Sequence, residues 1–168
     1  EITFWEDVAR KSPGNARAAN NLGYAYAVAC RDADALREFR RSMRLDATDY
    51  RWPYYLAQFY RLRGESERAV AQFEQASALN PQDVASQGWR GDLYLQLGQP
   101  GRAAPRFTQA LALQPTSVSA RFGLGRAALA KNDYAGAITH LEDVLTRDAT
   151  AVAAHYPLSL AYAGLGQT

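Results

Sequence analysis

Two histidines, one cysteine and two adjacent carboxylate pairs could support acid–base, nucleophilic or metal chemistry in this 168-residue chain. Neither His140 nor His155 has a partner at HxxxH or HxxE spacing, and Cys30 has no second cysteine for a disulfide or zinc site. The carboxylate pairs are Glu6 with Asp7 and Glu142 with Asp143. Adjacent residues point to different faces of a helix, so neither pair forms an acid–base dyad. The sequence therefore predicts a non-enzyme with no cofactor and no metal.

Aromatic and arginine side chains offer binding chemistry instead. On a helical wheel of residues 51–62, Leu56, Ala57 and Tyr60 lie on one side. Nearly opposite them lie Arg51, Tyr54, Tyr55, Gln58, Arg61 and Leu62. Tyr, Trp and Arg most often dominate the binding energy of protein interfaces. This second face is therefore the candidate binding surface.

Residue types recur along the chain with a period of 34 residues, and this period predicts the helices that carry these side chains. The predicted divisions are 1–15 (the second helix of a partial repeat), four repeats at 16–49, 50–83, 84–117 and 118–151, and 152–168 (the first helix of a further partial repeat). Each repeat is predicted to be two helices joined by a turn at Cys30, Gly64, Gly98 or Asn132, since Gly and Asn suit left-handed backbone. Incomplete repeats at both ends predict either that the chain is a segment of a longer protein or that its last helix docks on another partner.

Some columns of this repeat are constant and others vary. Alanine is constant at Ala35, Ala69, Ala103 and Ala137, and small residues recur at Gly23, Ala57, Gly91, Gly125 and Ser159. Aromatic residues recur at Tyr26, Tyr60, Tyr94 and Tyr162, and at Phe39, Phe73 and Phe107. A column that is always alanine predicts the closest approach of two helices, where one more methylene would clash.

The order Leu-Gly, Tyr, Ala, Phe and Pro at this period resembles the tetratricopeptide repeat (TPR) family. The resemblance implies an all-α fold, a right-handed α-solenoid of antiparallel helix pairs with about ten helices. Arg90, Ala128, Ala47 and Ala149 depart from the family pattern. Pro105 and Pro157 fall inside predicted helices, where each removes a backbone hydrogen bond and favours a kink.

In the TPR family the varying face of the first helices lines a concave groove that receives an extended peptide. Carried over by column, the groove residues are Arg17, Asn20, Asn21, Tyr24, Arg51, Tyr54, Tyr55, Gln58, Arg61, Trp89, Asp92, Phe122, Arg126 and Tyr156. Trp89 fits a groove and a core position equally well, because it adjoins Arg90 in a core column. Neither a Lys/Asn carboxylate clamp nor an asparagine ladder is present at the matching positions, so the predicted partner segment is apolar or proline-rich with some acidic character.

Three functions remain to be compared. The leading hypothesis is a non-enzymatic scaffold that binds a protein or peptide in the groove; the alternative is an architectural or self-association module, with a homo-oligomer as one form. Nucleic-acid binding is disfavoured, because 19 basic residues are balanced by 17 acidic ones and the two interleave along 31–49.

The sequence also bears on the location of the chain. No apolar run approaches the roughly 18 residues of a membrane span, so this segment is not expected to insert into a membrane. Residues 4–26 are faintly similar to the TPR tails of bacterial membrane proteins. That similarity favours a bacterial cytoplasm or periplasm, with tethering through flanking sequence as one arrangement.

Overall fold

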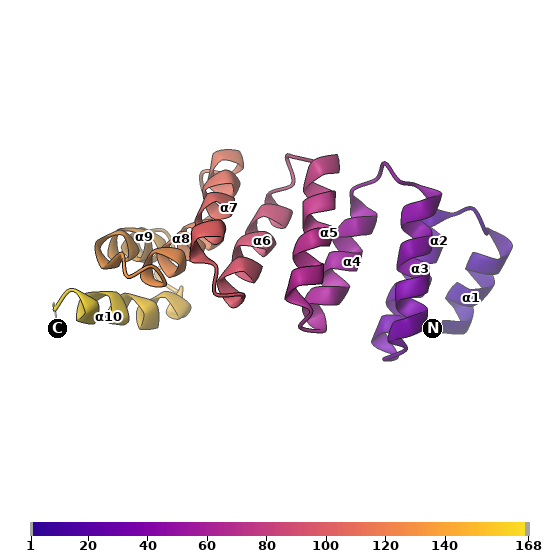
Figure 1. The fold of residues 1–168 in the computed structure, drawn as a ribbon, viewed down its shortest axis with the longest axis horizontal. Helices are drawn as coiled ribbons and strands as arrows, with labels where there is room; N and C mark the ends of the chain where they lie inside the picture. The colour runs from indigo at the N-terminus through magenta and orange to yellow at the C-terminus, as the bar shows by residue number, and fades with distance from the viewer. Residues whose placement is uncertain (1, 167–168) are drawn as a thin grey trace. The chain divides into compact units, whose positions relative to one another are not determined.

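A computed structural model describes residues 2–166, and within that range it contains ten α-helices, one 3₁₀ turn and no strand (Figure 1). The helices are α1 (Ile2–Lys11), α2 (Ala16–Val28), α3 (Asp32–Leu45), α4 (Arg51–Leu62), α5 (Ser66–Leu79), α6 (Val84–Gln96), α7 (Pro100–Leu113), α8 (Val118–Leu129), α9 (Tyr134–Arg147), η1 (Val152–Ala154) and α10 (His155–Gly164). The most extensive packing joins α2 to α3, α4 to α5, α6 to α7 and α8 to α9, each pair antiparallel. The predicted all-α class is confirmed.

The chain divides into two compact units. Unit 1 (Glu1–Pro81) contains α1–α5, and unit 2 (Gln82–Thr168) contains α6–α10. Each unit therefore holds two complete helix pairs and one further helix, α1 in unit 1 and α10 in unit 2. The division into 34-residue repeats at the stated boundaries stays a prediction.

The turns within the pairs have the left-handed backbone that the sequence predicts. The angle φ is 58° at Cys30, 75° at Gly64, 67° at Gly98 and 59° at Asn132. After each turn, the next backbone N–H bonds a carbonyl five residues back: Arg31 to Tyr26, Glu65 to Tyr60, Gln99 to Tyr94 and Asp133 to Ala128, at 2.8–2.9 Å. This bond satisfies a carbonyl that the helix end leaves unpaired, and it reverses the chain within a few residues.

Polar caps fix several helix starts. The Asn15 side chain accepts a hydrogen bond from the Ala18 N–H at 3.1 Å and begins α2. Asp83 and Ser117 begin α6 and α8 in the same way, through the N–H groups of Ser86 and Ala120. Side chains that accept from the first-turn amides typically stabilise a helix by about 1 kcal/mol.

The constant columns of the sequence form the contacts within the pairs. Ala35, Ala69, Ala103 and Ala137 each have an exposed fraction of zero. On the facing helix, a Cβ added to Gly91 would lie 2.6 Å from Cε1 of Phe107, and one added to Gly125 would lie 2.7 Å from Cγ of Leu141. The predicted close approach is thereby confirmed, except that Ser159 in the same column is exposed.

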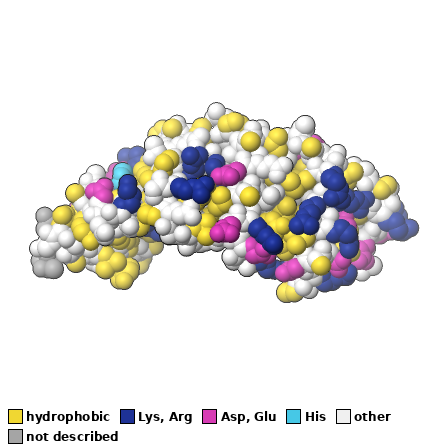
Figure 2. All heavy atoms as spheres, viewed as in Figure 1, with side chains coloured by type: hydrophobic (Ala, Val, Ile, Leu, Met, Phe, Trp, Pro, Cys, Tyr) yellow, Lys and Arg dark blue, Asp and Glu magenta, His cyan; other side chains and the backbone are white. Residues whose placement is uncertain are grey.

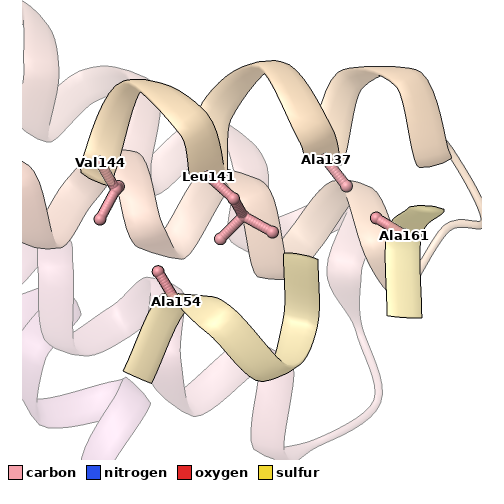
Figure 3. Packing of buried hydrophobic residues seen from close by; sticks show 5 residues of the cluster. All are labelled: Ala137, Leu141, Val144, Ala154 and Ala161. Carbon is pink, nitrogen blue, oxygen red and sulfur yellow. The ribbon is translucent and has the colours of Figure 1, made fainter. Parts of the chain in front are cut away.

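The core of unit 2 extends from α9 into η1 and α10. Figure 3 shows Leu141 and Val144 of α9 directed toward the chain segment that carries Ala154, and Ala137 lying near Ala161. All five residues are almost fully buried. Small residues on α10 thus let that helix lie close against α9.

Neither proline divides a helix. Pro105 lies within α7, which runs without a break to Leu113, so the expected kink does not interrupt that element. Pro157 is the third residue of α10, in the first turn, where an amide N–H lacks an intrahelical partner in any case.

Candidate functional site

Three hollows collect most of the predicted groove residues. The α2–α4 hollow, in unit 1, has a volume of about 590 Å³. It is lined by Asn20, Asn21, Tyr24, Ala27, Val28, Cys30, Phe39, Tyr54, Tyr55, Gln58, Phe59, Leu62 and Arg63. In unit 2, the α6–α8 hollow (about 610 Å³) includes Trp89 and Asp92, and the α8–α10 hollow (about 460 Å³) includes Phe122, Arg126 and Tyr156.

Aromatic packing fixes the walls of the α2–α4 hollow. Phe39 of α3 and Phe59 of α4 are buried with ring centroids 5.6 Å apart. Tyr54 lies edge-on to Phe73 of α5 at 5.5 Å and to Tyr55 at 5.9 Å. Edge-to-face arrangements of this kind are favourable and hold rings in place. These ring contacts hold the aromatic part of the lining against the neighbouring helices.

Asn20 is the buried polar group of this hollow. Its side chain lies on the second turn of α2, and the residue is only 5% exposed. Among the residues that the structure describes, Oδ1 of Asn20 has no hydrogen-bond partner. Buried amide oxygens are normally paired, so this unpaired oxygen lowers the stability of the free chain.

The arginines around the hollow are engaged by the protein itself. Nε and Nη2 of Arg63 donate to Asp32 at 2.8 and 2.6 Å, and Nη2 also donates to the Ala27 carbonyl at 2.8 Å. Hydrogen bonding from Arg63 lowers the pKa of Asp32. Arg51 binds Asp49 through Nε at 2.8 Å, which likewise holds the pKa of Asp49 below its ordinary value.

The hollows of unit 2 have a different chemistry. Nη1 of Arg126 lies 2.7 Å from Oδ1 of Asp92, and its guanidinium carbon lies 5.6 Å from the ring centroid of Phe122. Trp89 is half-buried in the wall of the α6–α8 hollow, while its neighbour Arg90 stays in the core. The structure thus places Trp89 in the wall of a hollow, while Arg90 keeps the buried orientation of its repeat position.

Some predicted residues lie outside the hollows. Arg17 and Arg51 are exposed but line none of the three, and Arg61 is half-buried with its Nε bonded to Oε1 of Gln58 at 2.8 Å. Gly123, which shares a column with Tyr55, is buried rather than open. A Cβ there would lie 2.3 Å from Cε1 of Phe107.

The sequence analysis missed part of the α2–α4 hollow. Val28, Cys30, Phe59 and Arg63 line it in addition to the predicted residues. One signal was available for Phe59, because its column holds Ala25, Phe59, Leu93, Ala127 and Ala161, which are apolar and buried throughout. Val28 and Arg63 sit at the ends of their helices, where column patterns carry less information.

The interleaved charges of residues 31–49 pair only in part. Arg31 and Arg37 both bind Asp34, and Arg41 binds Glu38. On the face shown in Figure 2, basic and acidic side chains lie interspersed over the region where Figure 1 places α1–α3. Interleaved charges along this stretch therefore form ion pairs at these contacts.

Residues 2–166 contain no group of three His, Cys, Asp or Glu side chains placed to hold a metal ion. Over the same range, the helices are too short and too polar to cross a bilayer.

Comparison with known protein families identifies the family of this chain. The sequence profile of the tetratricopeptide repeat matches residues 54–99, 90–154 and 125–167, which together span more than half of the chain. The chain belongs to the tetratricopeptide repeat family. The predicted resemblance is thereby confirmed, and TPR repeats are typically non-enzymatic interaction modules, which supports a protein-interaction scaffold.

Solved structures agree on the fold. YrrB, described as a TPR protein with an unusual peptide-binding site, superposes with a TM-score of 0.82 at 18% identity, over 99% of this chain and 86% of that one. A TPR protein from Parabacteroides merdae gives 0.85 at 20% identity, over 99% and 66%. MamA from Desulfovibrio magneticus gives 0.83 at 20% identity, over 90% and 86%. A comparison with curated proteins finds no match.

Proposed function

We propose that the varying face of the first helices binds an extended segment of a partner protein. One observation carries the proposal: most of the predicted groove residues, which come from varying columns, line the three hollows, whereas the constant alanine column is fully buried in the helix pairs. Residues that maintain the same helix packing are expected to be alike in every repeat. Residues that contact different parts of a partner are expected to differ from repeat to repeat. Apolar hollows with a few polar groups are typical of binding sites.

The side chains and the family both favour a peptide as the occupant. Tyr24 and Tyr156 are 64% and 73% exposed, so rigid aromatic surface is available at hollows of both units. Exposed Tyr contributes contact area at a low cost in conformational entropy. YrrB, which shares the fold, carries a peptide-binding site, and this supports the same class of ligand here.

Selection of peptides from a random dodecapeptide phage library on the immobilised chain tests the proposal. Enriched peptides are synthesised, and their affinity for the wild-type chain and for the Tyr55→Ala/Arg61→Ala double variant is measured by calorimetry. We expect the double variant to bind at least about tenfold more weakly, since truncation of a Tyr or Arg hot spot costs about 2 kcal/mol or more. Full affinity in the double variant, or a selection that enriches nothing, would contradict groove binding at this surface.

A self-association module is the alternative, and the face of α10 favours it. Tyr156 and Leu160 on this helix, and Leu165 directly after it, are large apolar side chains that are exposed. Exposed apolar surface of this kind marks interaction sites. Light scattering at increasing concentration separates the two functions, because self-association through α10 predicts a rise in mass that Leu160→Glu abolishes, while a peptide scaffold predicts a constant mass.

A further inference from the structure

One side of α3 carries three arginines that the chain neutralises only in part. A shallow depression of about 400 Å³ on this helix is lined by Ala33, Leu36, Arg37, Arg40 and Arg44. Spacings of three and four residues place the arginines on one side of the helix, nearly opposite the buried Ala35 and Ser42. We call this surface the basic face of α3. Its arginines line none of the three hollows of the first helices.

Two of the three arginines lack a carboxylate partner. Arg37 binds Asp34 through Nη1 at 2.7 Å. Nη2 of Arg40 donates only to the Tyr60 hydroxyl, at 3.5 Å, and within residues 2–166 no carboxylate lies at ion-pairing distance from Arg40 or Arg44. Like charges four residues apart on a helix repel each other, so this pair lowers the stability of the free helix. The uncompensated charge is therefore a cost that helix packing does not offset.

The other second helices do not share this charge. The column of Arg40 holds Glu6, Glu74, Thr108 and Glu142, and the column of Arg44 holds Arg10, Ala78, Ala112 and Thr146. Glu6 and Glu142 accept hydrogen bonds from tyrosine hydroxyls of the following helices, and Arg10 is paired with Asp7. Helix pairs of this fold thus form with an acidic or neutral residue at the position of Arg40. The reversal of charge on α3 has no counterpart in the packing.

A carboxylate-bearing segment complements both parts of the depression. The planar fork of an arginine side chain matches the two oxygens of a carboxylate. Arg40 and Arg44 are separated by about 6 Å along the helix axis, close to the roughly 7 Å between alternate residues of an extended chain. Between the arginines, Leu36 and Ala33 offer apolar contact. Two acidic side chains and one apolar side chain therefore fit this surface.

The extent of the charge favours a protein ligand over nucleic acid. Asp34 and Glu38 lie on the same helix and bind the neighbouring arginines, so the uncompensated charge is confined to two residues. Proteins that bind a phosphate backbone neutralise many phosphates along a longer basic surface. Two arginines beside apolar contacts are instead suited to a short acidic stretch of polypeptide.

We propose that the basic face of α3 is a second docking site, which binds an acidic segment of a partner protein. Arg40 and Arg44 pair with two carboxylates of that segment, and an apolar residue between them packs on Leu36. This inference goes beyond the proposed function, because it uses a second helix rather than the groove of the first helices. It also gives the acidic character expected of the partner a place on the chain.

Selection under competition directs the test to this face. Dodecapeptides from a random phage library are selected on the immobilised wild-type chain in an excess of soluble Arg40→Glu/Arg44→Ala, which removes peptides that bind elsewhere. That variant carries the residues of the equivalent α5 positions, Glu74 and Ala78, so it should fold with an unchanged or higher thermal midpoint. We expect the enriched peptides to contain at least two Asp or Glu residues beside an apolar residue.

Changing the charge on either partner should have the same effect. By fluorescence anisotropy, we expect a synthetic enriched peptide to bind Arg40→Glu/Arg44→Ala at least about tenfold more weakly, because two ion pairs are lost and one repulsion is gained. A peptide with its acidic residues replaced by Gln should bind both chains equally weakly. Rising salt should weaken only the acidic peptide on the wild-type chain.

Arg102→Glu/Arg106→Ala is the matched control, because it changes the same charge at the same spacing on α7. There Arg102 binds Gln99 and Arg106 binds Gln109. We expect this variant to keep full affinity for the acidic peptide. An equal loss in the control would show that net charge alone attracts the peptide, and it would overturn the site.

The remaining outcomes separate this inference from the proposed function. A competed selection that enriches nothing, or that enriches peptides without acidic residues, overturns the α3 site; groove peptides are still recovered without the competitor. Acidic peptides that lose affinity for Tyr55→Ala/Arg61→Ala but not for Arg40→Glu/Arg44→Ala would place the acidic ligand in the groove, which also overturns it. Retention of duplex DNA that Arg40→Glu/Arg44→Ala abolishes would assign the face to nucleic acid instead.

Discussion

At the scale of single residues, the turn positions show how strictly the backbone selects side chains. Four turns share the same left-handed conformation, and two of them use Gly64 and Gly98 while a third uses Asn132. Cys30 occupies the fourth with φ of 58°, although a side chain with a Cβ is disfavoured there. The exception adjoins the α2–α4 hollow, whose lining includes the Cys30 side chain.

Cys30→Gly should therefore stabilise the free chain. Relief of the left-handed conformation is worth about 1 kcal/mol, from which the greater entropy of glycine in the unfolded chain subtracts part. We expect a net gain of a few tenths of a kcal/mol up to about 1 kcal/mol in urea denaturation. Gly98→Ala is the reciprocal control and should destabilise the chain, since φ is 67° there and nothing lies near an added Cβ. A loss of stability in Cys30→Gly would show that the thiol contributes packing that outweighs the strain.

The fold follows from the sequence at the columns where every repeat carries the same residue type. Ala35 and its equivalents predict the contacts within the helix pairs, because a small residue at the same position of every repeat indicates a place where two helices approach closely. The candidate site is predicted less completely from the sequence, because the burial of a varying position depends on the side chains of the neighbouring helices. Asn20 and Gly123 both occupy predicted groove columns, yet one is buried against the hollow and the other is covered by Phe107. Only the packing of Phe107 of α7 against α8 shows that the Gly123 position is closed.

At the scale of elements, one ion pair joins the start of α3 to the turn that ends α4. Arg63 reaches Asp32 and the carbonyl of Ala27 at the end of α2, so it ties three helices together beside the hollow. The pair links residues of two successive helix pairs, α2–α3 and α4–α5. Its strength should therefore follow the ionisation of Asp32.

The stability that this pair contributes should depend on pH. Hydrogen bonding from Arg63 holds the pKa of Asp32 below the ordinary value of an aspartate. A lowered folded-state pKa gives stability that is present above the unfolded-state value and is lost as pH falls through the folded-state value. Asp32→Asn should therefore lower the denaturation midpoint at pH 7, and the difference from wild type should disappear as the pH falls through the lowered pKa of Asp32. Glu67→Gln, an exposed carboxylate in the first turn of α5, is the control. An Asp32→Asn deficit that persists unchanged at low pH would assign the effect to something other than the ion pair.

At the scale of the whole molecule, the charges balance. The net charge is +2, and the basic side chains of residues 31–49 are partly neutralised by carboxylates on the same helices. Proteins that bind nucleic acid through the phosphate backbone instead show a strong basic excess on one surface. The many arginines therefore serve mainly local contacts.

Duplex DNA should consequently bind weakly. We expect no retention of a labelled duplex in filter binding at about 0.15 M salt, because few phosphates could be neutralised at once. Any binding at low salt should disappear steeply as salt is added. Sequence-independent retention at physiological salt that is lost on replacing Arg40 and Arg44 by Gln would contradict this reading and make α3 a nucleic-acid surface.

The ring of Phe107 carries a further consequence. A Cβ added to Gly91 on one side or to Gly123 on the other would overlap it, so three positions share a single space. Substitution at one of these three positions therefore constrains the other two. A larger residue at position 91 or 123 requires a smaller residue at position 107. The neighbouring pair shows another solution to the same constraint, in which Leu141 faces Gly125. In related sequences, positions 91, 107 and 123 should therefore change together. The combined volume of the three side chains sets how closely α8 can pack against α6 and α7.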